Sequence, residues 1–325
     1  MRALVQPQFG DPSEVLSVQE VPTPEPGPGQ ALVRVLLSPI HNHDLWTVRG
    51  SYGFKPEMPA RAGTEMVGVV EALGEGAEGP AVGTRVAIGG AFGAWAEYVV
   101  ATAKALIPIP EGMSDEAASQ LVSMPFSAIA LLDFLEVSEG DWIVQNTANG
   151  AVGRMVAQLA KARGVRVLGL VRRAAGVEEL REQGIEDVVA TDDDGWRDRV
   201  AELVGDAPIV AGVDSVGGSA AGDVVSLLAE DGVLVVFGAM ASPTMEIASG
   251  DVIFKQVVIK GFWASKIFPA MSREKRAALM GELVAGISSG ALTLPVEKVF
   301  ALEEIADAAR ASAQPGRRGK ILLKP

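Results

Sequence analysis

The segment DWIVQNTANGAVGRMVAQLAKAR, residues 141–163, contains the pattern that decides the fold. Its opening residues, 141–146, are typical of a short buried strand, and residues 151–163 have the apolar spacing of a helix. The apolar face of this predicted helix consists of Val152, Met155, Val156, Leu159 and Ala160. A strand that passes directly into an amphipathic helix is the basic unit of a parallel α/β sheet.

Between the strand and the helix lies ANGAVG, residues 148–153, which fits the pattern A-x-G-x-x-G. Small residues at the marked positions let the backbone approach a pyrophosphate, whose charge is met by the N-terminus of the helix. A glycine-rich string alone is a weak signal, and the alternative is an ordinary tight turn. The strand before it, the helix after it and the strand that follows favour dinucleotide binding.

The alternation of strands and helices continues after this segment. VRVLGLV (165–171), PIVAGVDSV (208–216) and GVLVVFGA (232–239) predict strands, and a helix is expected near residues 218–229. Strands that alternate with helices predict a doubly wound parallel sheet. We assign residues 120–257 to this Rossmann domain.

The two flanks have different patterns. Residues 1–119 are rich in Gly and Pro and carry short alternating stretches between turn signals, which is typical of an antiparallel β domain. Residues 258–325 contain a further strand, a helix and a last helix–strand pair. An unstructured C-terminal segment would not show so much apolar periodicity, so we expect residues 258–325 to pack against the first domain and complete it. The predicted fold class is α/β.

Composition limits the classes of function. The 325 residues suffice for two domains of about 150 residues each. The net charge of −13 argues against a nucleic acid or an anionic membrane as partner. The absence of cysteine excludes disulfides, thiolate-bound zinc and cysteine nucleophiles. No signal peptide or membrane span is recognisable, so a cytoplasmic location is expected.

Arg172 and Arg173 follow the second predicted strand directly. Arg172 lies at the spacing from Gly153, about 20 residues, at which NAD-specific proteins place an acid on the ribose 2′-hydroxyl. An arginine at that position accommodates a 2′-phosphate instead, so NADPH is the expected cofactor. The alternative is that both arginines are merely solvated at a strand end.

Several stretches resemble the medium-chain dehydrogenase/reductase superfamily and, within it, the 2-enoyl thioester reductases of the mitochondrial trans-2-enoyl-CoA/ACP type. Quinone oxidoreductases share the fold and much of the glycine pattern. The resemblance implies a GroES-like catalytic domain (1–119 and 258–325) beside the Rossmann domain. The matching pieces span almost the whole chain in order: RGSYGFKPEMP (49–59), QNTANGAVG (145–153), LVRR (170–173), FGAM (237–240), VIFKQVVIKGFW (252–263) and GKILL (319–323).

The resemblance also implies roles for individual residues. Arg172 corresponds to the family's 2′-phosphate arginine, and Arg173 is a substitute for a second arginine that is Ala174 here. The implied cofactor contacts are Asn149, Gly150, Ala151, Val152 and Gly153 at the phosphate turn, Phe237, Gly238, Ala239, Met240, Phe262, Trp263 and Ala264 beside the nicotinamide, and Lys320 near the C-terminus. Trp263 fits a core position equally well, because GFW lies at a strand end.

Tyr52 is the implied catalytic residue. It lies in a Gly-rich loop outside any apolar pattern, where the plainer interpretation is an aromatic ring packed on a loop. In the enoyl thioester reductases the matching tyrosine faces the nicotinamide and hydrogen-bonds the substrate. We therefore expect Tyr52 to donate to the thioester carbonyl oxygen or to supply the proton for the α carbon.

Zinc is expected to be absent. At the positions of the ligands used by the zinc-dependent alcohol dehydrogenases of this superfamily, the chain has His41, Thr64 and Ser123, which offer one ordinary ligand. The chain's only histidines, His41 and His43, would share one face of a strand, and a structural or cleft-lining role is favoured over a metal site. The sequence His41-Asn42-His43-Asp44 stands where the family has Asn-Pro-Ser-Asp, and Met124 stands where it has an asparagine, so the chain departs from the family's pattern at these positions.

Three functions remain open at this stage. The first is NADPH-dependent reduction of an activated C=C bond, above all that of a trans-2-enoyl thioester of CoA or ACP, by hydride transfer to the β carbon. The second is reduction of a quinone or an enone with the same hydride. The third is a catalytically silent NADPH-binding protein. The expected partner is a small-molecule or thioester substrate. The resemblance also implies a homodimer, the superfamily's common arrangement, with the apolar strand VLVVFGAM near its interface.

Overall fold

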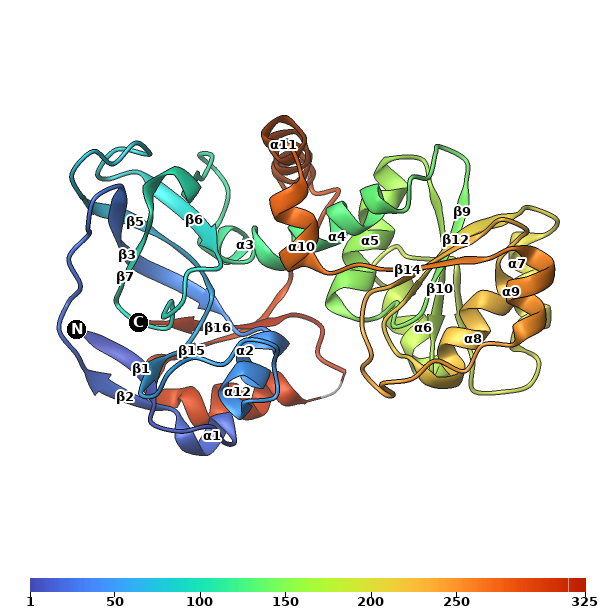
Figure 1. The fold of residues 1–325 in the computed structure, drawn as a ribbon, viewed down its shortest axis with the longest axis horizontal. Coiled ribbons are helices and arrows are strands. Elements are labelled where there is room, and N and C mark those ends of the chain that lie inside the picture. Colours follow the sequence, from blue (N-terminus) through green and yellow to red (C-terminus); the bar gives the residue numbers. More distant parts are fainter. Residues whose placement is uncertain (315) are drawn as a thin grey trace. The chain divides into compact units, whose positions relative to one another are not determined.

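The computed structural model describes residues 1–314 and 316–325. The chain forms two compact units (Figure 1). The β-rich unit comprises Met1–Ser123 and Thr293–Pro325, and the α/β unit comprises Met124–Leu292. The predicted α/β class is confirmed: along the chain, β-rich segments come before and after the segment that forms the parallel sheet.

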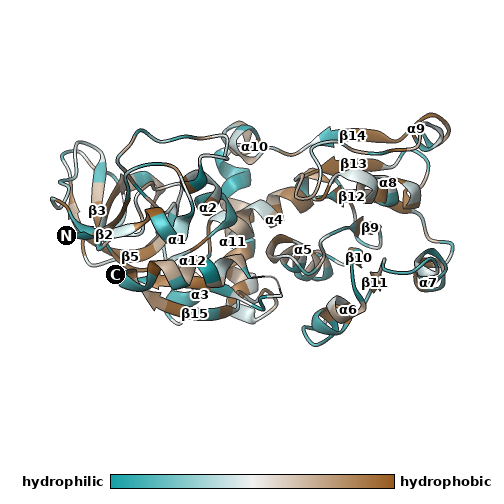
Figure 2. Ribbon diagram, turned by 90° about the horizontal axis from the view of Figure 1, so that it is seen from below, coloured by the Kyte–Doolittle hydropathy of each residue, from teal (hydrophilic) through white to brown (hydrophobic). Residues whose placement is uncertain are grey.

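The α/β unit is built on a six-stranded sheet with the strand order β11-β10-β9-β12-β13-β14 (Figure 2). Every neighbouring pair in this sheet is parallel. The strands are β9 (Trp142–Gln145), β10 (Arg166–Val171), β11 (Val188–Ala190), β12 (Ile209–Asp214), β13 (Val233–Val236) and β14 (Val258–Gly261). From β9 the chain adds β10 and β11 on one side of that strand, and it then adds β12, β13 and β14 on the other side. That reversal is the switch point at which doubly wound sheets bind ligands.

Helices join these strands. They are α4 (Ser123–Phe134), α5 (Ala151–Ala162), α6 (Ala174–Arg181), α7 (Trp196–Val204), α8 (Gly218–Leu227), α9 (Ser249–Lys255), α10 (Ala264–Ala270) and α11 (Arg273–Ser289). In α5 the predicted apolar face is confirmed, because Met155, Val156, Leu159 and Ala160 are buried and Val152 is half-buried. The core of the unit joins side chains of β9, β10, β12 and β13 to α7 and α8.

The β-rich unit contains a seven-stranded sheet with the order β15-β16-β3-β5-β6-β8, in which β7 also pairs with β3. A three-stranded sheet has the order β2-β1-β4. The strands are β1 (Arg2–Gln6), β2 (Ser17–Glu20), β3 (Gln30–Pro39), β4 (Ala60–Arg61), β5 (Glu65–Leu73), β6 (Arg85–Gly89), β7 (Tyr98–Thr102), β8 (Ile107–Pro108), β15 (Val296–Ala301) and β16 (Lys320–Lys324). All the pairs within residues 1–119 are antiparallel, as predicted.

Short helices complete this unit. They are α1 (Pro12–Val15), α2 (Asn42–Arg49), α3 (Asp115–Ser119), α12 (Ile305–Ala313) and the 3₁₀ turns η1 (Ala103–Ala105) and η2 (Leu302–Glu304). Helix α2 packs Leu45 and Val48 into the core formed by Leu4, Ile40 and Trp95. It ends at Gly50, whose φ of 74° is left-handed and favours glycine.

The C-terminal return begins later than expected. The sequence pattern places residues 258–292 in the first domain, but β14 pairs with β13 from Val233↔Val258 to Val236↔Gly261 and so belongs to the α/β sheet. Ion pairs from Lys275 to Asp133 (2.5 Å) and from Arg163 to Glu282 (2.8 Å) attach α11 to the same unit. The return itself is confirmed from Thr293 onward, since β16 pairs with β3.

No helix among the described residues is long and apolar enough to cross a membrane. The expected cytoplasmic location remains a prediction.

Candidate active site

The glycine-rich turn joins β9 to α5 at the carboxyl edge of the parallel sheet. Thr147 has a left-handed backbone with φ 50°, which is rare for a β-branched residue, and its carbonyl accepts the N–H of Gly150 at 2.7 Å. A Cβ at Gly153 would lie 2.6 Å from the carbonyl oxygen of Thr147. Only glycine therefore lets α5 start so close to the turn. The N-terminus of α5 opens over this edge, as the phosphate-binding prediction requires.

A polar network that the sequence did not suggest joins the ends of β9 and β12. The side-chain amide of Asn146 donates to Asp214 Oδ1 at 2.5 Å, and its oxygen accepts the N–H of Ser215 at 2.8 Å. Asp214 also accepts the N–H groups of Val216 (3.0 Å) and Gly217 (3.1 Å to Oδ2). These two strands flank the switch point, so the network fixes the backbone that borders the turn.

The segment from Phe237 to Met240, which includes Gly238 and Ala239, lies against this network. The N–H of Phe237 donates to the Asp214 carbonyl at 2.7 Å, and that of Met240 donates to the Ser215 carbonyl at 3.0 Å. The predicted strand therefore ends at Val236, and the next residues line the carboxyl edge of the sheet. The Met240 side chain is 61% exposed.

Phe262 and Trp263 differ in their surroundings although both follow β14 directly. The Phe262 ring is buried, 5.5 Å from the ring of Phe134 and 5.7 Å from that of Phe237. Trp263 is 67% exposed and is therefore no core residue of this unit, and Ala264 begins α10. Of this predicted group, the Trp263 side chain is open to a ligand, whereas that of Phe262 packs against other rings.

Arg172 and Arg173 are exposed at the carboxyl end of β10, and Arg173 caps α6. Among the described residues neither guanidinium takes part in an ion pair. One carboxylate lies close by, because Asp192 accepts the N–H of Ala174 at 3.2 Å. The two arginines are thus exposed cations on the same sheet edge as the glycine-rich turn.

The β-rich unit contains a second polar group of side chains, which we call the buried cluster: His41, His43, Asp44, Thr64, Glu65 and Lys320. Helix α2 supplies His43 and Asp44, and Asp44 anchors the start of the helix by accepting the N–H of His41, the residue before it, at 2.9 Å. Glu65 begins β5 and is fully buried, with Oε2 at 2.5 Å from Nε2 of His41. Its other oxygen accepts the N–H groups of Val122 (2.6 Å) and Ser123 (2.9 Å).

Burial changes the acidity of this cluster. Loss of hydration raises the pKa of Glu65 to about 7, because burial disfavours the charged carboxylate more than its two N–H partners stabilise it. Burial lowers the pKa of His41 well below its ordinary value. It also lowers the pKa of Lys320 to about 8, and Arg317 adds to this effect. Titratable groups with shifted pKa values gather at functional sites more often than elsewhere.

Tyr52 lies in the loop that follows α2, and its side chain is 39% exposed. Its ring centroid is 6.0 Å from that of His43, with the planes tilted by 35°. The Lys320 ammonium lies 3.5 Å from the carbonyl oxygen of Ile40, the residue before His41. The structure thus brings the predicted Tyr52 and Lys320 to the buried cluster, which the sequence did not identify.

The histidines lie at the start of a helix and not on a strand. His41 precedes α2 and His43 lies in its first turn, yet their rings still stack at 5.0 Å. Sequence reasoning also missed Glu65. The available signal was a carboxylate within the otherwise apolar stretch EMVGVV, residues 65–70.

These residues do not fit a zinc site. His41 uses Nε2 on Glu65, the Thr64 hydroxyl donates to Asp44 at 2.7 Å, and Ser123 has a hydroxyl where a strong ligand is needed. In the part of the chain that the structure describes, no three His, Asp or Glu side chains are grouped so that they could hold a metal ion.

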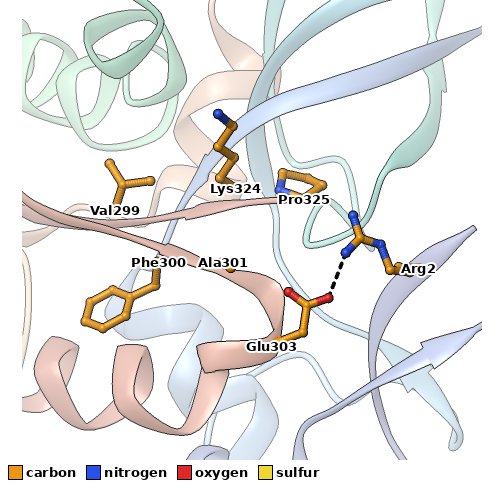
Figure 3. Close-up of a pocket in the computed structure, with 7 residues that line it drawn as sticks. All are labelled: Arg2, Val299, Phe300, Ala301, Glu303, Lys324 and Pro325. Atoms are coloured by element: carbon orange, nitrogen blue, oxygen red, sulfur yellow. Dashed lines mark hydrogen bonds and ion pairs between the residues drawn. The ribbon is translucent and has the colours of Figure 1, made fainter.

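One cavity of the β-rich unit lies at the end of β16, lined by Arg2, Phe300, Glu303, Lys324 and neighbouring residues (Figure 3). It has a volume of about 220 Å³. The Arg2–Glu303 ion pair, 2.7 Å, crosses this cavity (Figure 3). None of its lining residues belongs to the predicted site or to the buried cluster.

Comparison with known proteins places this geometry in a family. The family model described as "Alcohol dehydrogenase GroES-like domain" matches residues 27–111, and that described as "Zinc-binding dehydrogenase" matches residues 151–281. The human mitochondrial enoyl-[acyl-carrier-protein] reductase is 30% identical over 99% of this chain and 88% of its own length. The corresponding protein of Dictyostelium discoideum is 30% identical over 97% of this chain and 92% of its own length.

Solved structures agree with this assignment. A mycobacterial quinone oxidoreductase is 27% identical over the full length of both chains, with a TM-score of 0.89. A mycobacterial structure solved as a complex with NADPH is also 27% identical over both full lengths, with a TM-score of 0.86. The chain therefore belongs to the medium-chain dehydrogenase/reductase superfamily of oxidoreductases, among its enoyl reductase-like and quinone oxidoreductase-like members.

Proposed function

We propose that this protein reduces an activated C=C bond with NADPH, and that its substrate is a trans-2-enoyl thioester. The observation that carries the cofactor proposal is the pair of exposed arginines at the end of β10, on the same edge as the turn at Gly150–Gly153. Arg172 is placed to bind a 2′-phosphate, and the N-terminus of α5 to bind the pyrophosphate. The NADPH-bound mycobacterial relative supports this choice.

When bound, NADPH supplies a hydride to the β carbon of the substrate. Negative charge then develops on the thioester oxygen, and this is where a hydrogen-bond donor lowers the barrier most. We assign that donor to Tyr52, whose exposed phenol belongs to a loop beside the buried cluster. The phenol also provides the proton that the α carbon requires. This reaction needs no metal, in keeping with the donor set at His41, Thr64 and Ser123.

The names of the curated relatives favour the thioester, because those at 30% identity act as enoyl-[acyl-carrier-protein] reductases. The second candidate, reduction of a quinone or an enone, is favoured by the mycobacterial quinone oxidoreductase. Both reactions use the same hydride. The two reactions differ in the substrate oxygen on which negative charge develops. It belongs to a thioester with a long carrier in the first reaction and to a compact ring in the second.

Steady-state assays with crotonyl-CoA and with 1,2-naphthoquinone, each with NADPH, separate these functions. We expect kcat/KM for crotonyl-CoA to exceed that for the quinone. Turnover of the quinone alone would favour the second candidate. NADPH binding without turnover of either substrate would indicate the catalytically silent alternative.

We also propose a homodimer and revise the expected interface. The strand at residues 233–236 is β13, which lies between β12 and β14 and has no free edge. The outer strand β14 carries the exposed apolar side chains Val258 (53%) and Ile259 (38%). An open apolar edge strand is a natural place for a second chain to pair.

A further inference from the structure

A chain of hydrogen bonds leads from Asp44 to His43 through one hydroxyl group. Thr64 Oγ1 donates to Asp44 Oδ1 at 2.7 Å and lies 2.8 Å from Nε2 of His43. A threonine hydroxyl has a single proton, and a carboxylate only accepts. Since that proton goes to Asp44, His43 must donate from Nε2. The structure thus fixes the tautomer of His43.

The fixed tautomer leaves Nδ1 of His43 as the nitrogen that gains and loses a proton. Among the described residues no hydrogen bond engages Nδ1, and the side chain is 22% exposed. The ring also lies 6.0 Å from that of Tyr52, measured between centroids. A proton that enters from solvent at Nδ1 is therefore carried by a ring that neighbours the ring of Tyr52.

We propose that His43 is a positioning residue that restores the proton of Tyr52 during the reduction. This inference rests on the proposed function. The hydride supplies two electrons and one hydrogen to the β carbon, and the phenol of Tyr52 supplies the proton to the α carbon. The Nδ1–H of the His43 imidazolium then returns a proton to the phenolate. Neutral His43 recovers its proton from solvent, so atoms and charges balance.

The groups around His43 suit this task. Asp44 Oδ1 lies 3.6 Å from Nε2 and stabilises the imidazolium, while the stacked ring of His41 stays neutral at ordinary pH. Glu65 and Lys320 lie on the side of His41: Oε2 of Glu65 is 2.5 Å from Nε2 of His41, and the Lys320 ammonium is 3.5 Å from the carbonyl oxygen of Ile40. Among the described residues, Tyr52 is the further titratable group whose ring contacts that of His43, from the loop after the helix.

Two substitutions separate this role from a structural one. His43→Gln places an amide N–H near the position of Nε2, so the bond to Thr64 is kept while the titrating nitrogen is lost. Asp44→Asn reverses the chain: its oxygen must still accept from the backbone of His41, so its NH₂ group faces Thr64. The hydroxyl then donates to Nε2, and His43 must carry its proton on Nδ1.

The tautomer is measured directly by long-range ¹H–¹⁵N NMR. The chain has only two histidines, so the His43→Gln variant assigns both rings. We expect Nε2–H for neutral His43 in the parent protein and Nδ1–H in Asp44→Asn. The same tautomer in both proteins would overturn the inference. This measurement needs no substrate, so it determines the tautomer of His43 even if the proposed function is wrong.

Kinetics with crotonyl-CoA test the proton transfer, because Tyr52 is assigned as the donor to the thioester. We expect kcat of the parent to fall as the pH rises, because the transfer needs the proton on Nδ1 of His43. His43→Gln should lower kcat at pH 6 by a factor on the order of 10² and remove this fall. Arg49→Gln, on the same helix but with its side chain paired to Asp11 and outside the chain of hydrogen bonds, should keep both the rate and the profile.

The double variant shows whether His43 acts through Tyr52. If it does, His43→Gln should cost nothing further in a Tyr52→Phe background, because the phenol that it serves is gone. An independent, additive loss would overturn the inference. So would a His43→Gln protein that keeps the parent's pH profile.

Discussion

The carboxyl group of Glu65 and the imidazole of His41 lie 2.5 Å apart, from Oε2 to Nε2, and neither side chain is exposed to solvent. Burial raises the pKa of Glu65 to about 7 and lowers that of His41 well below its ordinary value. Both groups are therefore neutral in mildly acidic solution. Above pH 7 the pair carries one buried negative charge.

Glu65 should make the protein less stable as the pH rises. Its folded pKa, about 7, is above its ordinary value of 4.5, so the stability it contributes is complete below pH 4.5 and is lost as pH rises through 7. Glu65→Gln mimics the neutral carboxyl group. The stability of the parent relative to this variant should fall by roughly 3 kcal/mol between pH 4.5 and 8.

Urea unfolding of both proteins across this pH range measures the difference. Glu71→Gln, at an exposed position on the same strand, is the matched control and should give a difference that hardly changes with pH. If the free energies of unfolding of the parent and of Glu65→Gln also differ by the same amount at every pH, Glu65 does not titrate near pH 7.

The sequence predicts local features of this fold better than distant ones. The turn at 148–153 and the helix after it are encoded by neighbouring residues, so their pattern identifies them. The place of β14 depends on which sheet the strand joins, and its apolar residues fit either unit. Glu65 meets His41 across a separation of 24 residues, and nothing within EMVGVV reveals that contact.

Arg172→Ala should remove most of a preference for NADPH over NADH. Charge-assisted contacts contribute about 1.5–3 kcal/mol, which corresponds to roughly ten- to a hundred-fold in affinity. Fluorescence titration of both cofactors measures the ratio. Arg181→Ala, at the far end of α6, should leave it unchanged. Equal affinities for NADPH and NADH in the parent protein would contradict the assignment of Arg172.

Activity should survive prolonged treatment with EDTA, and metal analysis should find much less than one zinc per chain. The reason is the set of groups at His41, Thr64 and Ser123, which are hydrogen-bonded and mostly poor zinc ligands. The assay and elemental analysis are made on the same sample. A content of one zinc per chain, lost together with activity, would contradict this prediction.

Val258→Lys should convert the proposed dimer to a monomer, because a lysine on an edge strand opposes pairing with another strand. Light scattering after gel filtration gives the mass of each species. Val299→Lys, at an exposed position on β15 of the other unit, is the control and should stay dimeric. A parent protein that is monomeric at micromolar concentration would rule out this interface.

Tyr52→Phe should lower turnover and leave NADPH binding nearly intact. The ring remains and only the hydroxyl is lost. If that hydroxyl meets charge that develops only in the transition state, the loss falls mainly on kcat, by a factor on the order of 10²–10³. Tyr98→Phe, on β7, removes the same atom from the chain's other tyrosine and should keep the parent rate.

Melting temperatures measured beside the kinetics separate catalysis from packing. A Tyr52 that served only the structure would give a lower melting temperature and near-normal turnover, the opposite pattern. Because the phenol is 39% exposed, we expect the melting temperature of Tyr52→Phe to stay close to that of the parent. Should this variant reduce an enoyl thioester at the parent rate, Tyr52 is not the donor. Reduction of a quinone or an enone, which needs no donor at this position, would then become the better assignment.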